Sequence, residues 1–173
     1  MATDRYEHIV HPFPPLYDEK SEILILGSLP SVKSREQKFF YGHPQNRFWK
    51  VMSQILGEEL PLTINDKKAM LHAHHIALWD TIYSCDIIGS SDSSIKNVVP
   101  TDLTNIISGS RVNKVICNGK TSGKYYMKYQ QKVLGIEPAI LPSTSPANAA
   151  FSVERLVDNW SVEIPDACKN KFS

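Results

Sequence analysis

The sequence predicts an α/β protein, a three-layer α/β/α sandwich around a central, mostly parallel four-stranded sheet. Short apolar runs recur at residues 23–26, 76–79, 112–117 and 138–141, and such continuous runs are typical of strands buried on both faces. Segments with helical spacing lie between the runs, and no tight hairpin signal joins two of them. Strands that alternate with helices favour a parallel sheet covered by helices on both faces.

Helix boundaries are expected where glycines and small polar residues stand. Helices over residues 48–56 and 121–134 should end at Gly57 and Gly135, because glycine suits the left-handed position after a helix. The other expected helices begin at polar caps, namely residues 65–66, residues 101–102, and Ser145 with Pro146 in the first turn of a helix reaching Trp160.

The 173 residues fit one domain, with residues 1–21 as an extended lead-in and residues 161–173 as a C-terminal tail. The formal net charge is only +1, so DNA binding would need a local basic patch. No apolar stretch suits a membrane span or a signal peptide, which predicts a cytoplasmic protein without a membrane partner. The three distant cysteines, Cys85, Cys117 and Cys168, favour core thiols in a reducing compartment.

Polar, turn-like segments follow the four apolar runs at residues 27–31, Asp80, residues 118–119 and residues 143–148. Ligands of open α/β sheets bind beyond the carboxyl ends of the strands, so these segments are expected to line one cleft. Taken alone, residues 27–31 are equally a simple strand-to-helix turn, and residues 143–148 are more simply a helix cap. The serine-rich residues 89–94 are expected to form a mobile loop.

Residues 41–49 combine aromatic rings, two amides and an arginine in one short loop. Aromatic rings stack on a flat heterocycle, amides read its edge, and arginine binds phosphate. Tyr41 is the candidate for stacking. Asn46 has two open roles, as cap of the helix at residue 48 or as an amide aimed into a pocket.

Other chemistries find little support in the chain. Residues 27–31 lack the lysine of a phosphate-binding P-loop, and no metalloprotease or hydrolase signature is present. His72, His74 and His75 lack ligand partners at metal-binding spacing, so histidines at a helix end, beside its dipole, are favoured.

Two motifs in this order resemble those of the uracil-DNA glycosylase superfamily. The first joins Gly-Ser-Leu-Pro-Ser at residues 27–31 to Tyr-Gly-His-Pro-Gln-Asn-Arg-Phe-Trp-Lys at residues 41–50, and the second is the Ser/Pro-rich segment at residues 143–148. The chain is similar to the mismatch-specific uracil/thymine branch and most similar to the hypoxanthine-DNA (deoxyinosine) glycosylases. The resemblance implies a repair enzyme that flips out and hydrolytically excises a deaminated base, chiefly hypoxanthine, without metal or organic cofactor.

One position departs from the mismatch-specific branch, whose first motif reads Gly-Ile-Asn-Pro-Gly and uses its Asn to position the attacking water. Leu29 stands there in this chain and cannot make that hydrogen bond. The hypoxanthine branch implies that an Asn further along does this work, which we map onto Asn46. Two alternatives stay open: a G:U or G:T mismatch-specific uracil/thymine-DNA glycosylase, and a non-catalytic DNA- or nucleotide-binding relative.

The resemblance also implies a division of the site into three groups of residues. Asn46 is the catalytic residue, holding water through its side-chain carbonyl. The partner is double-stranded DNA with a damaged base, bound by a monomer with modest, salt-sensitive affinity. The expected base-binding residues are Gly27, Ser28, Leu29, Tyr41 and Asn118, and the expected DNA-binding residues are Ser31, Lys33, Arg47, Ser143, Ser145, Pro146 and Asn148.

Overall fold

The computed structural model describes residues 5–169 and contains the expected parallel sheet. Its strand order is β3-β2-β6-β7, and every pair is parallel. The strands are β2 (Ile23–Gly27), β3 (Ile76–Asp80), β6 (Lys114–Asn118) and β7 (Pro138–Leu141). Burial at every position of β2 and β3 explains their unbroken apolar sequences. The third predicted strand begins at Lys114 rather than at residue 112.

The register brings three polar strand ends to one edge of this sheet. Gly27 pairs with Asp80 across β2 and β3, and Leu26 pairs with Cys117 across β2 and β6. Asn118, the next residue of β6, pairs with Leu141 of β7. Gly27, Asp80 and Asn118 therefore end side by side.

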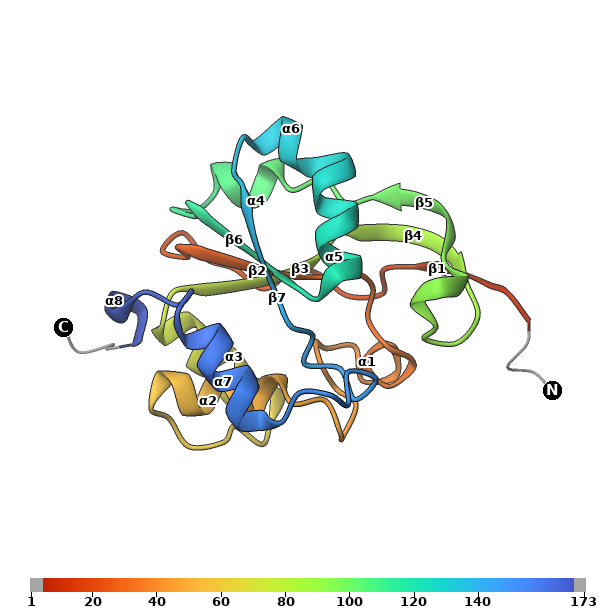
Figure 1. Cartoon of the computed structure of the whole chain (residues 1–173). Helices are drawn as coiled ribbons and strands as arrows, with labels where there is room; N and C mark the ends of the chain where they lie inside the picture. The colour runs from red at the N-terminus through yellow and green to blue at the C-terminus, as the bar shows by residue number, and fades with distance from the viewer. Residues whose placement is uncertain (1–4, 170–173) are drawn as a thin grey trace.

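Helices cover both faces of the parallel sheet, which confirms the three-layer prediction (Figure 1). One layer holds α4 (Thr104–Ser108), α5 (Lys120–Tyr125), the π-helical segment η3 (Tyr126–Gln130) and α6 (Gln131–Leu134). The other holds α2 (Phe48–Leu56), α3 (Ile64–Ala73) and α7 (Val153–Ser161). Gly57 and Gly135 end their helices with φ of 69° and 70°, as predicted.

Two predicted helix starts are wrong. The last helix begins at Val153, because Ser152 caps it by accepting the Arg155 N–H at 3.2 Å. Ser145 and Pro146 lie in a turn before it. Helix α3 begins at Ile64, and its cap is Thr63 rather than residues 65–66.

The start of α4 is close to its prediction. The helix begins at Thr104, and the Asp102 carboxylate accepts the Thr104 backbone N–H at 2.9 Å.

The apolar runs of the sequence do not predict a second sheet, which is antiparallel. Strands β1 (Glu7–Val10), β4 (Ile82–Ile87) and β5 (Lys96–Pro100) form an antiparallel sheet in the order β1-β4-β5. β1 lies within the predicted extended lead-in, and the serine-rich segment with η2 (Asp92–Ser94) joins β4 to β5. β1 and β5 are largely exposed, so they lack the apolar runs that mark the parallel strands.

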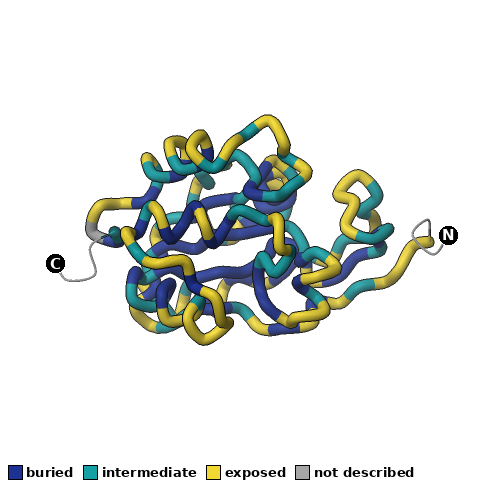
Figure 2. The backbone as a smooth tube through the Cα atoms, turned by 90° about the horizontal axis from the view of Figure 1, so that it is seen from below, coloured by how far each residue is buried: buried dark blue, intermediate teal, exposed yellow. Residues whose placement is uncertain are grey.

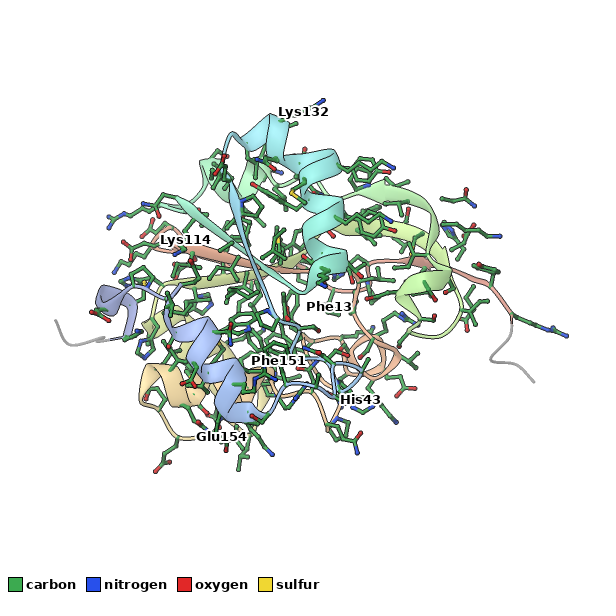
Figure 3. All side chains as sticks on the ribbon, in the orientation of Figure 1. Phe13, His43, Lys114, Lys132, Phe151 and Glu154 are labelled. Atoms are coloured by element: carbon green, nitrogen blue, oxygen red, sulfur yellow. The ribbon has the colours of Figure 1, made fainter. Side chains whose placement is uncertain are left out.

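Buried side chains fill the space between the layers, and the buried stretches run through the middle of the molecule (Figure 2). Phe13, from the lead-in, lies among these interior side chains (Figure 3). Cys85, Cys117 and Cys168 are buried and free, as expected of core thiols. No helix in the described part of the chain is long and apolar enough to cross a membrane.

Gln130 ties the two sheets to the helical layer. This side chain is buried, and its Nε2 donates to the carbonyl oxygens of Thr81 at 2.8 Å and Thr101 at 3.2 Å. Thr81 is the single residue between β3 and β4, and Thr101 directly follows β5. The junction between the sheets is therefore held by hydrogen bonds.

The predicted C-terminal tail includes the short helix α8 (Asp166–Lys169), and residues 170–173 lie outside the described residues. His72, His74 and His75, at the end of α3, each meet a carboxylate, from Asp18 at 3.1 Å, Glu58 at 2.8 Å and Glu22 at 3.1 Å. His74 also hydrogen-bonds the backbone carbonyl of Cys168. These histidines thus join α3 to neighbouring segments.

Candidate active site

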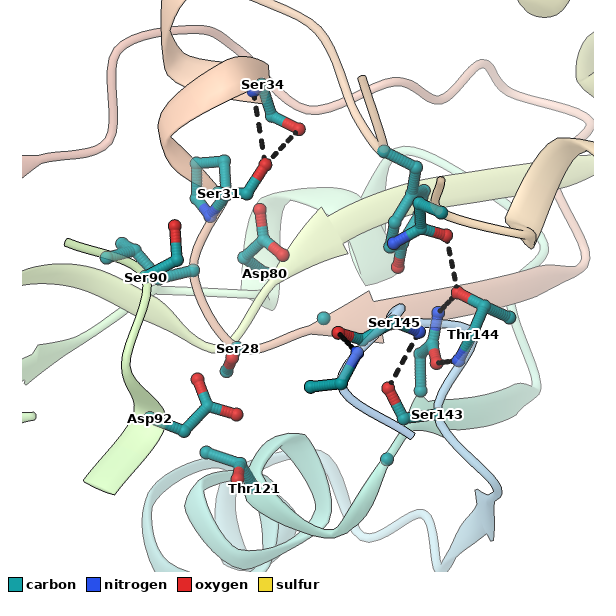
Figure 4. Close-up of a pocket in the computed structure, with 18 of the residues that line it drawn as sticks. Ser28, Ser31, Ser34, Asp80, Ser90, Asp92, Thr121, Ser143, Thr144 and Ser145 are labelled. Carbon is teal, nitrogen blue, oxygen red and sulfur yellow. Dashed lines mark hydrogen bonds between the residues drawn. The ribbon is translucent and has the colours of Figure 1, made fainter. Parts of the chain in front are cut away.

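A cavity of about 440 Å³ opens at the sheet edge where Gly27, Asp80 and Asn118 end. This volume is within the range of sites that hold small ligands. Its walls come from the four segments that follow the parallel strands, from the Tyr41–Asn46 loop, and from residues 90–93 of the β4–β5 connection (Figure 4).

Most of the sequence-predicted site residues line this cavity. Lys33, Arg47, Pro146 and Asn148 do not, and Lys33 is an exposed residue paired with Glu36 at 3.6 Å. The residues that line it are Gly27, Ser28, Leu29, Ser31, Tyr41, Asn46, Asn118, Ser143 and Ser145.

Serine hydroxyls connect the two parts of the first motif. Ser31 caps α1 (Val32–Gln37) by accepting the Ser34 N–H at 3.2 Å. The Ser34 hydroxyl in turn accepts the Gly42 N–H at 2.9 Å. The loop after β2 and the loop that carries Tyr41 are therefore built as one wall of the cavity.

Gly27 is needed because other groups occupy the space of a side chain. A Cβ at this position would lie 2.5 Å from Asp80 Oδ1 and 3.3 Å from the Tyr41 hydroxyl oxygen. Both polar groups thus converge on the glycine at the inner end of the cavity.

Tyr41 is fixed by stacking and by its backbone. Its φ is +52°, and its ring stacks on that of Phe48 with centroids 4.1 Å apart and planes 21° apart. Burial, and then the negative charge of Asp80, raise the pKa of Tyr41, while the Asn118 amide acts in the opposite sense. The hydroxyl is therefore protonated and can donate a hydrogen bond.

Asn46 is oriented by two donors. Its Oδ1 accepts the Phe48 backbone N–H at 2.9 Å and the Thr144 hydroxyl at 2.8 Å. A backbone N–H only donates, so the atom facing it must be the amide oxygen. The Nδ2 group makes no hydrogen bond to the described residues and is the part of the amide left for a ligand.

This geometry corrects the expectation that the Asn46 carbonyl holds water. Both lone pairs of Oδ1 already have donors, and one of these donors is the first residue of α2. Arg47 holds the N-cap position of that helix without a side-chain bond. Asn46 thus serves the helix start and the cavity together, through different atoms.

Thr144 connects the second motif to both amides. It is fully buried, and its hydroxyl accepts from Asn118 Nδ2 at 3.0 Å while donating to Asn46 Oδ1. Its backbone N–H donates to Asn118 Oδ1 at 3.0 Å. The side-chain oxygen of Asn118 is therefore engaged by the loop.

Arg47 holds the loop of the second motif from the other side. Its guanidinium donates to the carbonyl oxygens of Ser145 at 2.7 Å, Asn148 at 3.0 Å and Phe151. Its backbone N–H donates to the Thr144 carbonyl at 3.1 Å. Arg47 therefore holds the loop in place through these hydrogen bonds. A contact between Arg47 and DNA stays a prediction.

Sequence reasoning missed three parts of the cavity. Thr144 sits inside the second motif, but nothing in its residue type marks it as the link between two amides. Asp80 stood out only as a polar strand end, although it lines the cavity. Residues 90–93 were expected only to form part of a mobile loop. They reach the cavity through the second sheet, which the sequence does not predict.

The fold and this cavity define a known class of protein. Residues 14–163 match the family model described as the uracil DNA glycosylase superfamily, and the chain belongs to that superfamily.

Individual relatives refine this picture. A protein named hypoxanthine DNA glycosylase from Methanosarcina acetivorans is 37% identical over 83% of this chain and 90% of the relative. A protein of the same name from Methanosarcina barkeri is 36% identical over 79% and 86% of the two chains. A solution structure titled as a candidate uracil DNA glycosylase from Methanosarcina acetivorans superposes with a TM-score of 0.78 at 31% identity. It covers 92% of this chain and 99% of its own.

Proposed function

We propose that this chain is a DNA N-glycosylase that flips a deaminated base, chiefly hypoxanthine, out of DNA and hydrolyses its N-glycosidic bond. The names of the two relatives and membership of the superfamily support this reaction. A base must leave the stack to enter a cavity of this kind, and damaged pairs are the least costly to open.

The observation that carries the proposal is the placement of Asn46. Its amide lines the cavity, and its orientation is set by Phe48 and Thr144. Asp, Ser or Thr would serve the start of α2 as well, so capping alone does not require an amide at the cavity. This side chain therefore favours catalysis over simple binding, even though Leu29 replaces the motif Asn of the mismatch-specific branch.

In the proposed reaction, Tyr41 stacks on the flipped base and Asn46 Nδ2 donates to the attacking water. An amide is a poor proton acceptor, so its contribution is positioning rather than general-base catalysis. The sugar becomes cation-like as the bond breaks, and negative charge grows on the departing base. Donors aimed at that charge lower the barrier.

The loop of residues 143–148 is proposed to hold the DNA backbone. Ser145 accepts the Ala147 N–H at 3.2 Å, so the loop is shaped as a turn with hydroxyls at the cavity mouth. Backbone N–H groups and hydroxyls of this kind bind phosphate and fix the position of the duplex. We also propose that the protein acts as a monomer in the cytoplasm.

The test is release of base from labelled duplexes that carry hypoxanthine, uracil, xanthine or thymine opposite each normal base. Fastest single-turnover release of hypoxanthine is expected. Release confined to uracil and thymine opposite guanine would support the mismatch-specific alternative. Binding without release from any duplex would support the non-catalytic one.

A further inference from the structure

A buried histidine–aspartate pair at the inner end of the cavity has no part in the reaction described so far. His11 Nε2 lies 2.7 Å from Asp80 Oδ2, and the two side chains are 0% and 5% exposed. Asp80 lines the cavity at the end of β3 (Figure 4), whereas His11 comes from the lead-in before β2.

The surroundings of His11 fix which group donates. Its ring centroid lies 4.1 Å from that of Trp79 and 4.7 Å from that of Phe13, and its Nδ1 has no hydrogen-bond partner among the described residues. A proton on Nδ1 would leave a buried donor unsatisfied. The His11 Nε2–H therefore donates to Asp80 Oδ2.

The second oxygen of Asp80 has no such donor. Oδ1 accepts no hydrogen bond from the described residues, and none of their lysines or arginines forms an ion pair with Asp80. A buried carboxylate with an unused oxygen is costly. The oxygen lies beside Gly27, where a Cβ would come within 2.5 Å of it. A ligand that enters the cavity and carries an N–H group would satisfy it.

We propose that Asp80 Oδ1 accepts the ring N–H that lies beside a carbonyl in deaminated bases, which is N1–H in hypoxanthine. This assignment rests on the proposed function and names the chemical feature that the site recognises. Hypoxanthine, xanthine and uracil all carry such an N–H, as do guanine and thymine, so the contact separates hypoxanthine from adenine and uracil from cytosine. Adenine and cytosine present a lone pair at the same ring position, which the carboxylate repels.

The different burial of Asp80 and Asn46 supports different roles for the two side chains. Asp80 is 3% exposed, whereas Asn46 is only half-buried. A flipped base enters first and its sugar stays near the mouth, so Asp80 meets the edge of the base and Asn46 meets the bond to the sugar.

The first experiment compares duplexes containing hypoxanthine or 1-deazahypoxanthine, in which a C–H group replaces N1–H. The wild-type protein is expected to release hypoxanthine roughly 10- to 100-fold faster, as expected for a lost hydrogen bond to a charged group. Equal rates for the two bases would overturn the assignment of Asp80. No release of either base would instead contradict the proposed function.

The second experiment repeats the comparison with Asp80→Asn. The His11 Nε2–H holds the amide oxygen, so the new NH₂ group points into the cavity and opposes N1–H. The preference for hypoxanthine over the 1-deaza base should fall roughly 10- to 100-fold relative to that of the wild type, and dividing one preference by the other cancels differences in leaving-group ability. An unchanged ratio in the folded variant would refute the proposal.

Two further variants provide a control and an independent check of this result. Asp86→Asn changes a similar carboxylate, 2.8 Å from His8 on the antiparallel sheet outside the cavity, and should keep the wild-type ratio. Gly27→Ala keeps Asp80 but pushes its carboxylate away, so it should also lower the ratio, and it replaces Asp80→Asn if that variant does not fold. If Gly27→Ala keeps the wild-type preference for hypoxanthine over the 1-deaza base, the assignment of Asp80 is contradicted.

Discussion

The parallel and antiparallel sheets border one cavity but are built differently. β2 and β3 are buried along their whole length, whereas β1 and β5 are mostly exposed. The parallel sheet places Gly27, Asp80 and Asn118 at the cavity through its strand ends. The antiparallel sheet contributes residues 90–93 through a connecting segment. The comparison indicates that the buried strand ends form the inner part of the cavity, that the loop before α2 adds Tyr41 and Asn46, and that the antiparallel sheet shapes the mouth.

Replacement of Asn46 should give the largest effect and test the chemical side of this comparison. Asn46→Ala should lower single-turnover excision of hypoxanthine by about 10²–10³-fold, because it removes the positioned donor. The loss of Oδ1 at the start of α2 should cost about 0.5–2 kcal/mol of stability, measured by thermal melting.

Asn46→Asp is the matched variant. It keeps an oxygen for Phe48 and Thr144 but replaces Nδ2 with a second oxygen. It should melt like the wild type and excise poorly. Near-normal turnover by Asn46→Ala would reduce this residue to a helix cap, and faster turnover by Asn46→Asp would indicate general-base catalysis.

A smaller effect is expected from Thr144→Val, which keeps the shape of the side chain and removes the hydroxyl between the two amides. Asn118 Nδ2 loses its partner and Asn46 keeps only the Phe48 N–H. Stability should fall by about 1–3 kcal/mol, and excision should fall roughly tenfold, in line with a misplaced rather than missing group. Thr144→Ser keeps the hydroxyl and should retain most of the stability and the excision rate of the wild type. If Thr144→Ser loses as much of either as Thr144→Val does, packing of the methyl group is responsible instead.

Asp92→Asn tests how the antiparallel sheet contributes to DNA binding. Asp92 lies at the cavity in the β4–β5 connection and brings negative charge to a surface that would face phosphates. Its neutralisation should tighten binding of lesion-containing duplex by a few-fold at low salt, and the affinity should then fall more steeply as salt rises, because salt screens the repulsion that the wild type carries. Asp66→Asn, an exposed position on α3, is the control. Affinity that does not respond to salt in any of these proteins would argue against DNA as the ligand.

The smallest expected effect concerns the buried core beneath the parallel sheet. Burial raises the pKa of Cys117 and of Tyr126 to about 12, from usual values of 9.0 and 10.0. The unfolded chain loses these protons first, so stability should be full below about pH 9 and decline as the pH rises toward 12. Melting temperature measured across this range should fall less steeply in Tyr126→Phe.

The sequence predicts the parallel sheet because each of its strands is a continuous apolar run, and it predicts the cavity edge because polar residues follow these runs. It does not predict β1, since Glu7 and His8 belong to an exposed strand without a periodic apolar face. Ser145-Pro146 has the local chemistry of a helix start, yet Ser152 caps α7 because Arg47 holds the preceding carbonyls in an irregular loop. Tertiary bonds of this kind leave no local signal.

The same limit applies to the candidate site. The resemblance leads to Asn46 and Tyr41, because short motifs record them. It does not lead to the pairing of His11 with Asp80, which are separated by 69 positions and meet only when the lead-in crosses the sheet edge. Thr144 is likewise defined by two partners that are distant in sequence.

Gln130 has a consequence for the kinetics of lesion capture. Its bonds to Thr81 and Thr101 hold the two sheets to each other, and we expect the sheets to keep their relative position when a ligand binds. The slow motion in finding a lesion then belongs to the DNA. Capture should follow the opening rate of the damaged pair, and hypoxanthine opposite a poorly pairing partner should be taken up faster than the same base in a stable pair.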